Sequence, residues 1–472
     1  MTLLAVTALL FGAGQEAPSF VDRHVEARLG AVKPAGPCDE GEFLRRLALD
    51  LTGVVPKVED LKTYLARPDR TKEVDKLLAS DGFDAWWARF LIELVTPADD
   101  ADLYGWLKGE LKRRRPYQAL VRDLITAEGN SLDTPAVNFL LRYLPRLQDV
   151  TGVVGTAFLG TNLRCAECHR DPSSALAPQD FWGLAAFFAR ARSYRATAIG
   201  EDDPYARTFG VVEQRRGGWV CLPKTDSRNN FGGCEPVPVP PDVKPVWVEA
   251  RWLGAAKPTV NGGRQEFADF LVADPRFARN LVNRVWARLM GRGLQEPLDG
   301  LGGKIKPSHP ELLEDLAGHF VKTGYDLRAT IRLIVLSKAY QRSCRSDGSD
   351  PRLFAHAALR PLSAEQMAAS LAQIAGRPVP SALFGPAQSL RQVHAMLQHP
   401  DVEGLIQAGA ERVLKDLPGP VAQGHFEYVY LSVLSRPPSE PERKELSGKT
   451  TPEDLRDVFW ALINSLEFKY NH

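Results

Sequence analysis

A stretch rich in proline and glycine, residues 193–262, separates two long segments that carry the apolar spacing of helices. Its run Pro-Val-Pro-Val-Pro-Pro at 236–241 disfavours a helix, because proline lacks the backbone N–H that a helix interior requires. Short alternating apolar runs at 209–212 and 246–248 favour strands instead. We therefore expect a linker that is partly extended and contains a small β element.

The segments on either side of this linker are predicted to be helical. In the first, Asp39 and Glu42 form a capping-box pattern ahead of Phe43, Leu44 and Leu47, which share one helix face. In the second, apolar residues from 277 to 289 recur at helical spacing. The sequence predicts a mainly α protein with two helical domains, residues 18–192 and 263–472, joined by the linker at 193–262.

The composition is that of a soluble globular protein. Apolar residues make up 44% and charged residues 25% of the 472 residues, enough for two or three domains with their own cores. Lysine and arginine number 59 against 58 acidic residues, so the net charge of +1 gives no field for steering onto nucleic acid. We expect no nucleic-acid partner.

The N-terminus favours export. Residues 2–14, TLLAVTALLFGAG, are apolar or small and uncharged, and the run is too short to span a bilayer comfortably. They fit the apolar region of a signal peptide, with small residues at 12–14 for cleavage, although only the amino terminus supplies a positive charge. We predict a signal peptide at 1–17, a periplasmic or extracellular location, and a soluble mature chain. The alternative is a buried N-terminal helix.

The pentapeptide Cys165-Ala-Glu-Cys168-His169 is the motif with the most chemistry. In c-type cytochromes two thiols at this spacing add to the two vinyl groups of one haem, and the histidine ligates the iron. The sequence therefore predicts a covalent haem c on Cys165 and Cys168, with His169 as the metal ligand. Export agrees with this prediction, because covalent attachment takes place outside the bacterial cytoplasm.

Other interpretations of the pair stay open. A zinc site would need two further ligands, and no second CxxC or HxxxH occurs. A redox dithiol usually follows a strand, whereas here a helix is expected before the motif. An inert pair or a structural disulfide is the remaining alternative. Among the other cysteines, Cys221 and Cys234 flank a Gly/Asn-rich turn and are the best disulfide candidates in an exported chain.

No sixth iron ligand is identifiable by pattern. The candidates by residue type alone are His309, His319, His394, His399, Met290, Met367 and Met396. For each of them a structural role is the favoured interpretation, because Met290 continues an apolar helical stripe and His319 falls on a polar face.

Several stretches resemble a known pair of modules. FLRRLALDLTG at 43–53, FLGTNLRCAECHRDP at 158–172 and DFWGLAAFF at 180–188 resemble the planctomycete cytochrome-c-like module of the second type. PSHPELLEDLAGHFVKTGYDLRATIRLIVLSKAYQRS at 307–343 and ALINSLEFKYNH at 461–472 resemble the planctomycete-specific C-terminal domain of unknown function that usually follows it. The resemblance covers nearly the whole chain from residue 43.

The resemblance implies an exported protein with a c-type haem on Cys165, Cys168 and His169, acting in redox chemistry with an unidentified redox partner protein. The family's frequent genomic setting suggests a glycan-degradation context. One departure stands out: where the family commonly has a second histidine, this chain has Asp171, a poor axial haem ligand. The enzyme class is left open, and the alternative function is a structural or binding protein, glycan- or protein-associated, without haem.

Overall fold

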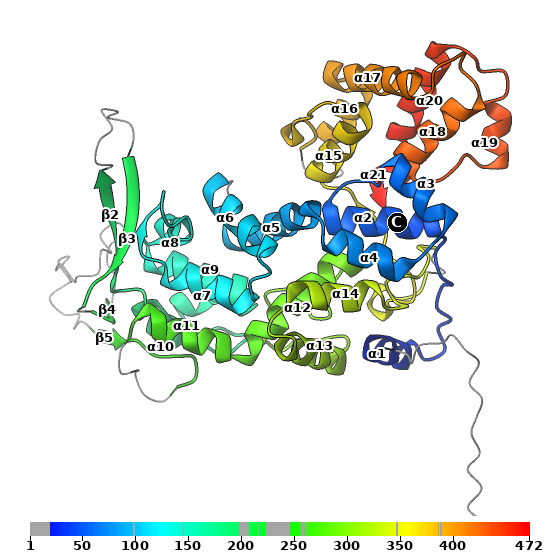
Figure 1. Cartoon of the computed structure of the whole chain (residues 1–472). Helices are drawn as coiled ribbons and strands as arrows, with labels where there is room; N and C mark the ends of the chain where they lie inside the picture. The colour runs from blue at the N-terminus through cyan, green and yellow to red at the C-terminus, as the bar shows by residue number, and fades with distance from the viewer. Residues whose placement is uncertain are drawn as a thin grey trace, which may run out of the picture.

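The computed structural model describes residues 19–97, 100–144, 146–197, 207–215, 217–222, 246–255, 259, 262–345, 348–385, 387 and 389–472. Figure 1 shows an elongated arrangement of helices with a small β region at one end and a separate group of helices, α15 to α20, at the other. The C-terminus lies beside α2 (Glu40–Thr52), so the last residues of the chain return to one of its first helices.

The first part of the chain forms ten α-helices among the described residues, and a 3₁₀ turn precedes the last of them. The helices are α1 (Phe20–Leu29), α2 (Glu40–Thr52), α3 (Val58–Ala66), α4 (Arg70–Leu78), α5 (Asp81–Val95), α6 (Ala101–Lys112), α7 (Tyr117–Thr126), α8 (Val137–Tyr143), α9 (Leu147–Phe158) and α10 (Pro178–Ala186). The 3₁₀ turn, η1, spans Arg164–Glu167 and lies between α9 and α10.

Two small antiparallel sheets follow. The first has the order β1-β3-β2, from β1 (Gly129–Asn130), β2 (Ala191–Thr197) and β3 (Arg207–Glu213). The second pairs β4 (Trp219–Leu222) with β5 (Val246–Glu249), with Val220 opposite Val248. Both valines are buried, and the sheet of β4 and β5 packs against α10.

The second part is helical again and ends beside the first. Its elements are α11 (Arg264–Ala273), α12 (Pro275–Met290), α13 (Pro310–Lys322), α14 (Leu327–Val335), η2 (Pro351–Leu353), α15 (Ala364–Ala375), η3 (Ser381–Leu383), α16 (Leu390–Gln398), α17 (Pro400–Asp416), α18 (Gln423–Leu434), α19 (Glu440–Glu445), α20 (Pro452–Asn464) and α21 (Leu466–Lys469). A short pairing of β6 (Arg360–Pro361) with β7 (Tyr470–Asn471) joins the start of the α15–α20 group to the end of the chain.

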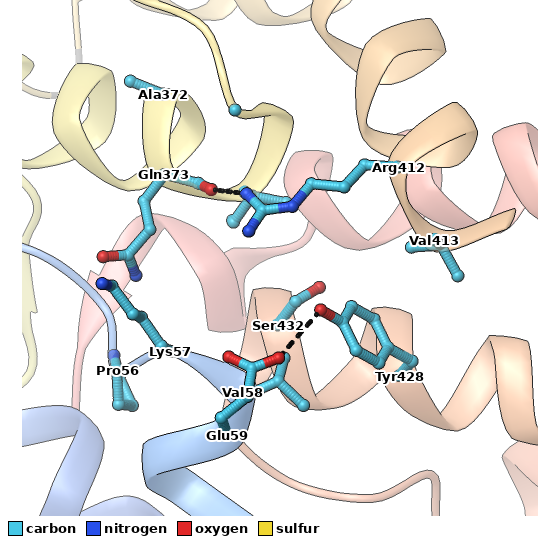
Figure 2. Close-up of a pocket in the computed structure, with 12 residues that line it drawn as sticks. Pro56, Lys57, Val58, Glu59, Ala372, Gln373, Arg412, Val413, Tyr428 and Ser432 are labelled. Carbon is cyan, nitrogen blue, oxygen red and sulfur yellow. Dashed lines mark hydrogen bonds between the residues drawn. The ribbon is translucent and has the colours of Figure 1, made fainter. Parts of the chain in front are cut away.

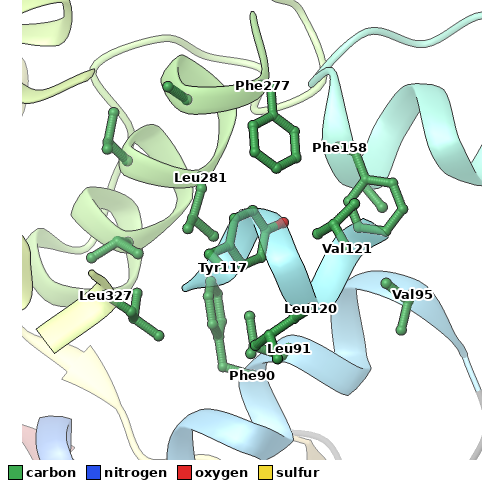
Figure 3. Packing of buried hydrophobic residues seen from close by; sticks show 14 of the residues in the cluster. Phe90, Leu91, Val95, Tyr117, Leu120, Val121, Phe158, Phe277, Leu281 and Leu327 are labelled. Atoms are coloured by element: carbon green, nitrogen blue, oxygen red, sulfur yellow. The ribbon is translucent and has the colours of Figure 1, made fainter. Parts of the chain in front are cut away.

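Both parts of the sequence share one hydrophobic core. Buried residues from α1 through α14 form one continuous cluster, and Figure 3 shows Tyr117 and Leu120 of α7 facing Phe277 and Leu281 of α12. Tyr117 stacks on Phe277 with ring centroids 5.3 Å apart. A second cluster collects α15–α21 together with Leu49 and Val55 from the first part. Because buried apolar area drives folding, helices before and after the linker depend on each other for stability.

A buried arginine reinforces this dependence. Arg264, at the start of α11, is fully buried and donates hydrogen bonds to the carbonyls of Ile125 and Ala127 and to the Glu213 carboxylate. Its partners all belong to the segment before the second sheet. Removing it would leave buried acceptors without donors, which is costly.

The mainly α fold with a small β element confirms the sequence prediction, and the alternating runs at 209–212 and 246–248 fall in β3 and β5. At the C-terminus α20 ends at Asn464, because Ser465 caps a separate short helix, α21. The domain bounds 18–192, 193–262 and 263–472 stay predictions.

The predicted signal peptide at 1–17 lies outside the described residues, as does Cys234 with the side chain of Cys221. In the part of the chain that the structure describes, none of the helices combines the length and apolarity needed to cross a bilayer.

Candidate functional site: the CxxCH turn

The CxxCH motif begins at Cys165, seven residues after α9 ends at Phe158. The chain leaves this helix through Gly160, which has a φ of +58°, and a Cβ there would lie 2.7 Å from Oδ1 of Asn280 on α12. Glycine therefore meets two demands at this position, a left-handed backbone and close packing against the second part of the chain. The turn η1 follows and carries the cysteines.

Cys165 lies in this turn and Cys168 caps its C-terminal end. A 3₁₀ helix has three residues per turn, so side chains three positions apart are aligned, and the N–H of Cys168 donates to the carbonyl of Cys165. Both thiols are free and exposed, whereas Ala166 between them is fully buried. The motif thus presents two free thiols to solvent, three positions apart along the chain.

The turn is fixed by α10. The indole Nε1 of Trp182 donates to the carbonyl of Glu167 at 3.0 Å, and the Trp182 side chain is buried. Beside it, Arg164 pairs with Asp149 of α9 at 2.7 Å. These contacts hold the backbone of the turn without using either thiol.

His169 follows the turn with one ring nitrogen engaged. Its Nδ1 lies 2.9 Å from the carbonyl oxygen of Arg170, and a carbonyl can only accept, so Nδ1 carries the proton in this contact. In the neutral imidazole Nε2 is then the unprotonated nitrogen, and it has no partner among the described residues. This is the tautomer in which a neutral histidine binds metals, with its other N–H donated to a carbonyl.

Asp171, which stands where the family commonly has a histidine, organises its own loop. Its buried carboxylate accepts hydrogen bonds from the backbone N–H and hydroxyl groups of both Ser173 and Ser174. Burial raises the pKa of Asp171, but the hydrogen bonds from the two serines outweigh it, so the pKa is lowered overall. The carboxylate is occupied within the loop and is not offered to the motif.

The segment after α12 closes over the motif loop. The N–H of Asn162 donates to the Asp299 carbonyl, the N–H of Leu301 to the Gly160 carbonyl, and the Thr161 hydroxyl to the Leu301 carbonyl. Asn280 of α12 also donates to the last turn of α9, at Ala157. The second part of the chain therefore contributes to the position of the CxxCH turn, which no sequence spacing predicted.

The residues suggested as sixth ligands lie in other elements. Met290, Met367 and Met396 are buried in helices α12, α15 and α16. His309 is also buried, and burial followed by the charge of Arg28 lowers its pKa to about 4. The structure brings Cys165, Cys168 and His169 together on one turn and identifies no axial partner for them.

The described residues hold no group of three or more histidine, cysteine, aspartate or glutamate side chains placed to bind a metal ion. A zinc site completed by further protein ligands at the CxxC pair therefore gains no support from the part of the chain that is described. The donor set that is present, two exposed thiols and one imidazole, fits covalent attachment of a haem.

Two cavities elsewhere were not anticipated. Figure 2 shows one of about 250 Å³, into which Lys57, Glu59, Arg412 and Tyr428 project. Its polar groups largely satisfy one another: Tyr428 Oη lies 3.3 Å from Glu59, and Arg412 donates to the Gln373 carbonyl at the end of α15. The second cavity, of about 200 Å³, lies where α2, α5, α12, α15 and β7 meet, and its groups are less completely paired.

Comparison with known families agrees with the resemblance. Residues 20–193 match the PSCyt2 family, described as a protein of unknown function (DUF1549). Residues 263–399 match the PSD1 family, described as a protein of unknown function (DUF1553). The two matches follow one another along the chain in the predicted order. Searches of curated proteins and of solved structures found no match.

Proposed function

We propose that this protein is an exported c-type haem protein with a redox role, in which Cys165 and Cys168 attach the haem and His169 ligates the iron. A bound haem would supply one-electron chemistry at its iron. The protein's own contribution is to hold the two thiols and the imidazole on one fixed turn and to shield the backbone around them.

The observation that carries this proposal is the exposure of the two thiols, three positions apart. A haem presents two vinyl groups on one edge, so both sulfurs must reach the same side of the turn. This requirement is compatible with the structure, in which Cys165 lies in the 3₁₀ turn, Cys168 caps its end three positions later, and both thiols are exposed. A structural cysteine pair would be expected to be buried or joined, and these are neither.

The tautomer of His169 supports the same assignment. The contact of Nδ1 with the Arg170 carbonyl leaves Nε2 as the nitrogen available to a metal when the imidazole is neutral. A redox partner protein and a periplasmic or extracellular location belong to this proposal. So does the glycan-degradation context suggested by the resemblance.

The proposal is tested by maturing the full chain in an oxidising compartment together with haem-attachment machinery and recording its absorption spectrum. We expect a sharp α-band on reduction that survives acid–acetone extraction, because thioether bonds hold the haem. Replacement of both Cys165 and Cys168 by alanine should abolish the extraction-resistant colour.

Two further variants separate ligation from attachment. His169→Ala should keep covalent haem but alter the reduced spectrum, because the iron loses a ligand and not its tether. Cys344→Ala, which removes a thiol in a different part of the chain, should leave the spectrum unchanged. A colourless wild-type protein with titratable thiols at 165 and 168 would contradict the proposal and leave a non-haem binding role.

A further inference from the structure

The cavity of about 200 Å³ joins three regions of the chain. It is lined by Asp50 of α2, Trp86 and Glu93 of α5, Arg288 of α12, Glu365 in the first turn of α15, and Asn471 of β7. These elements come from both family modules and from the C-terminal segment beyond them. A site here would be complete only in the assembled chain.

One wall of the cavity is formed by Asp50, whose charge and hydrogen bonds are fully matched by its neighbours. The buried Asp50 carboxylate accepts two hydrogen bonds from Arg360, one from the Tyr340 hydroxyl and one from the Asn471 amide nitrogen, each 2.8 or 2.9 Å long. Four donors saturate this carboxylate. They also fix the orientation of the Asn471 amide, because only its nitrogen can donate to Asp50.

The fixed amide leaves an acceptor without a partner. Asn471 is 2% exposed, and its Oδ1 is buried without a hydrogen bond although the residue lines the cavity. A buried unpaired acceptor of this kind destabilises a fold unless something donates to it. A ligand in the cavity that donates a hydrogen bond to Asn471 Oδ1 would therefore be stabilising.

The neighbouring side chains offer unpaired donors. The indole Nε1 of Trp86 is buried without a partner. The Arg288 guanidinium lies over the same indole, 4.7 Å from the ring centroid, and its charged partner Glu93 is 3.6 Å away. Among the described residues it makes no hydrogen bond. Trp86 and Arg288, which both line the cavity, therefore retain N–H groups without an acceptor among the described residues.

The carboxylates of Glu93 and Glu365 add negative charge. Partial burial raises the pKa of Glu93, the Arg288 guanidinium opposes this, and the like charge of Glu365 raises the pKa further. Asp50 and Arg360 neutralise each other, so two carboxylates face one guanidinium. The lining carries one net negative charge, which favours a ligand with a positive group.

We infer that this cavity binds a small primary amine that carries an oxygen acceptor on the neighbouring carbon atoms, the chemistry shared by amino alcohols, α-amino acids and amino sugars. The ammonium group donates to Asn471 Oδ1 and is attracted by Glu93 and Glu365. The oxygen accepts from Trp86 Nε1 and Arg288. This inference is independent of haem binding, because neither the thiols nor His169 line the cavity.

The test follows the indole N–H resonance of Trp86 by NMR in the full chain labelled with ¹⁵N-tryptophan, with the resonance identified by Trp86→Phe. The probes are ethanolamine, L-serine and glucosamine, and the controls are glycerol and glucose, which lack the ammonium group. We expect saturable shifts with at least one amine and weaker or absent shifts with the controls. The amine that binds most tightly shows whether the natural ligand is an amino alcohol, an amino acid or an amino sugar.

Matched variants complete the test. Glu365→Gln should weaken amine binding at least tenfold, whereas Glu440→Gln, the same charge change in the first turn of α19, should have no effect. Because Glu365 has no hydrogen bond among the described residues, its replacement should preserve the fold. Absence of any shift with all three amines would overturn the inference, and equal shifts with glycerol or glucose would overturn the requirement for an ammonium group.

Discussion

The CxxCH turn and the junction cavity are built in opposite ways. The turn keeps its reactive groups at the surface, and its backbone is held by Trp182 and by segment 299–301. The cavity keeps its polar groups inside, where Asp50 is tied to three other elements of the fold. The first can lose its functional side chains without losing its shape, whereas the wall of the second that is built around Asp50 cannot.

This difference separates two kinds of site. Groups that act on an external ligand contribute little to folding when they are exposed, so their removal tests function alone. Buried charges are part of the fold, and removal of one partner leaves the others uncompensated. Each of the following predictions tests how much one residue contributes to stability and how much to function alone. They are ordered from the largest expected effect to the smallest.

Asp50→Ala should give the largest loss. It leaves the buried Tyr340 and Asn471 and the partly buried Arg360 without this acceptor, which typically costs about 3–5 kcal/mol of the free energy of unfolding. Urea unfolding followed by circular dichroism measures this loss, and Asp50→Asn, which keeps the shape and one oxygen, should lose less. A loss below about 1 kcal/mol for the alanine variant would show that the cavity does not depend on this charge.

Asp171→Ala should give an intermediate loss, confined to the motif loop. The loop loses the acceptor for the hydrogen bonds of Ser173 and Ser174, which we expect to cost about 1–2 kcal/mol. Hydrogen exchange of residues 170–176 measures the loosening directly. Unchanged protection of these amides would show that the loop is held by other contacts.

The contribution of Asp171 should also depend on pH with a defined sign. Its folded pKa is lowered, so the stabilisation is complete above the unfolded value of about 3.9 and is lost as the pH falls through the folded value. The stability difference between wild type and Asp171→Asn should be constant from pH 5 to 7 and shrink below pH 4. A difference that grows on acidification would contradict the lowered pKa.

Trp182→Phe should have a smaller effect that is specific to the turn. It removes the hydrogen bond to the Glu167 carbonyl, worth about 1 kcal/mol, while keeping an aromatic ring in the buried position. Thiol-modification rates at Cys165 and Cys168 should change as the turn loosens. Trp460→Phe, at a tryptophan that is 44% exposed, serves as the control and should leave these rates unchanged.

Replacement of both Cys165 and Cys168 by alanine should give the smallest effect on the haem-free chain. Both side chains are exposed, so the free energy of unfolding should change by no more than about 0.5 kcal/mol. Cys38→Ala, at a buried thiol, should destabilise more. A large loss from the exposed pair would instead indicate a structural role for CxxCH.

The sequence predicted what depends on local spacing. The helices follow from apolar periodicity, and the cysteine and histidine of the motif share one turn because they are close in sequence. The resemblance predicted the order of the two modules, which the family matches confirm. Each of these features is contained in a short window of residues.

What the sequence did not predict depends on contacts between distant residues. Asp50 and Asn471 are 421 positions apart, and Arg264 reaches Ile125 across 139 positions. Single charged residues in a helix pattern resemble solvated surface charges, so nothing marked Asp50, Arg288 or Arg360 as buried. The role of Asp171 was missed for a similar reason: a departure from a family pattern drew attention to iron, whereas its carboxylate organises a loop.

The intact mass of the matured full chain tests the central proposal most directly. Covalent attachment predicts a mass increase of one haem in the wild type, located on the peptide that contains Cys165 and Cys168, and none in the variant with both cysteines replaced by alanine. A wild-type chain that leaves the maturation system at its apo mass, with both thiols free, would contradict the assignment of CxxCH as a haem-attachment site.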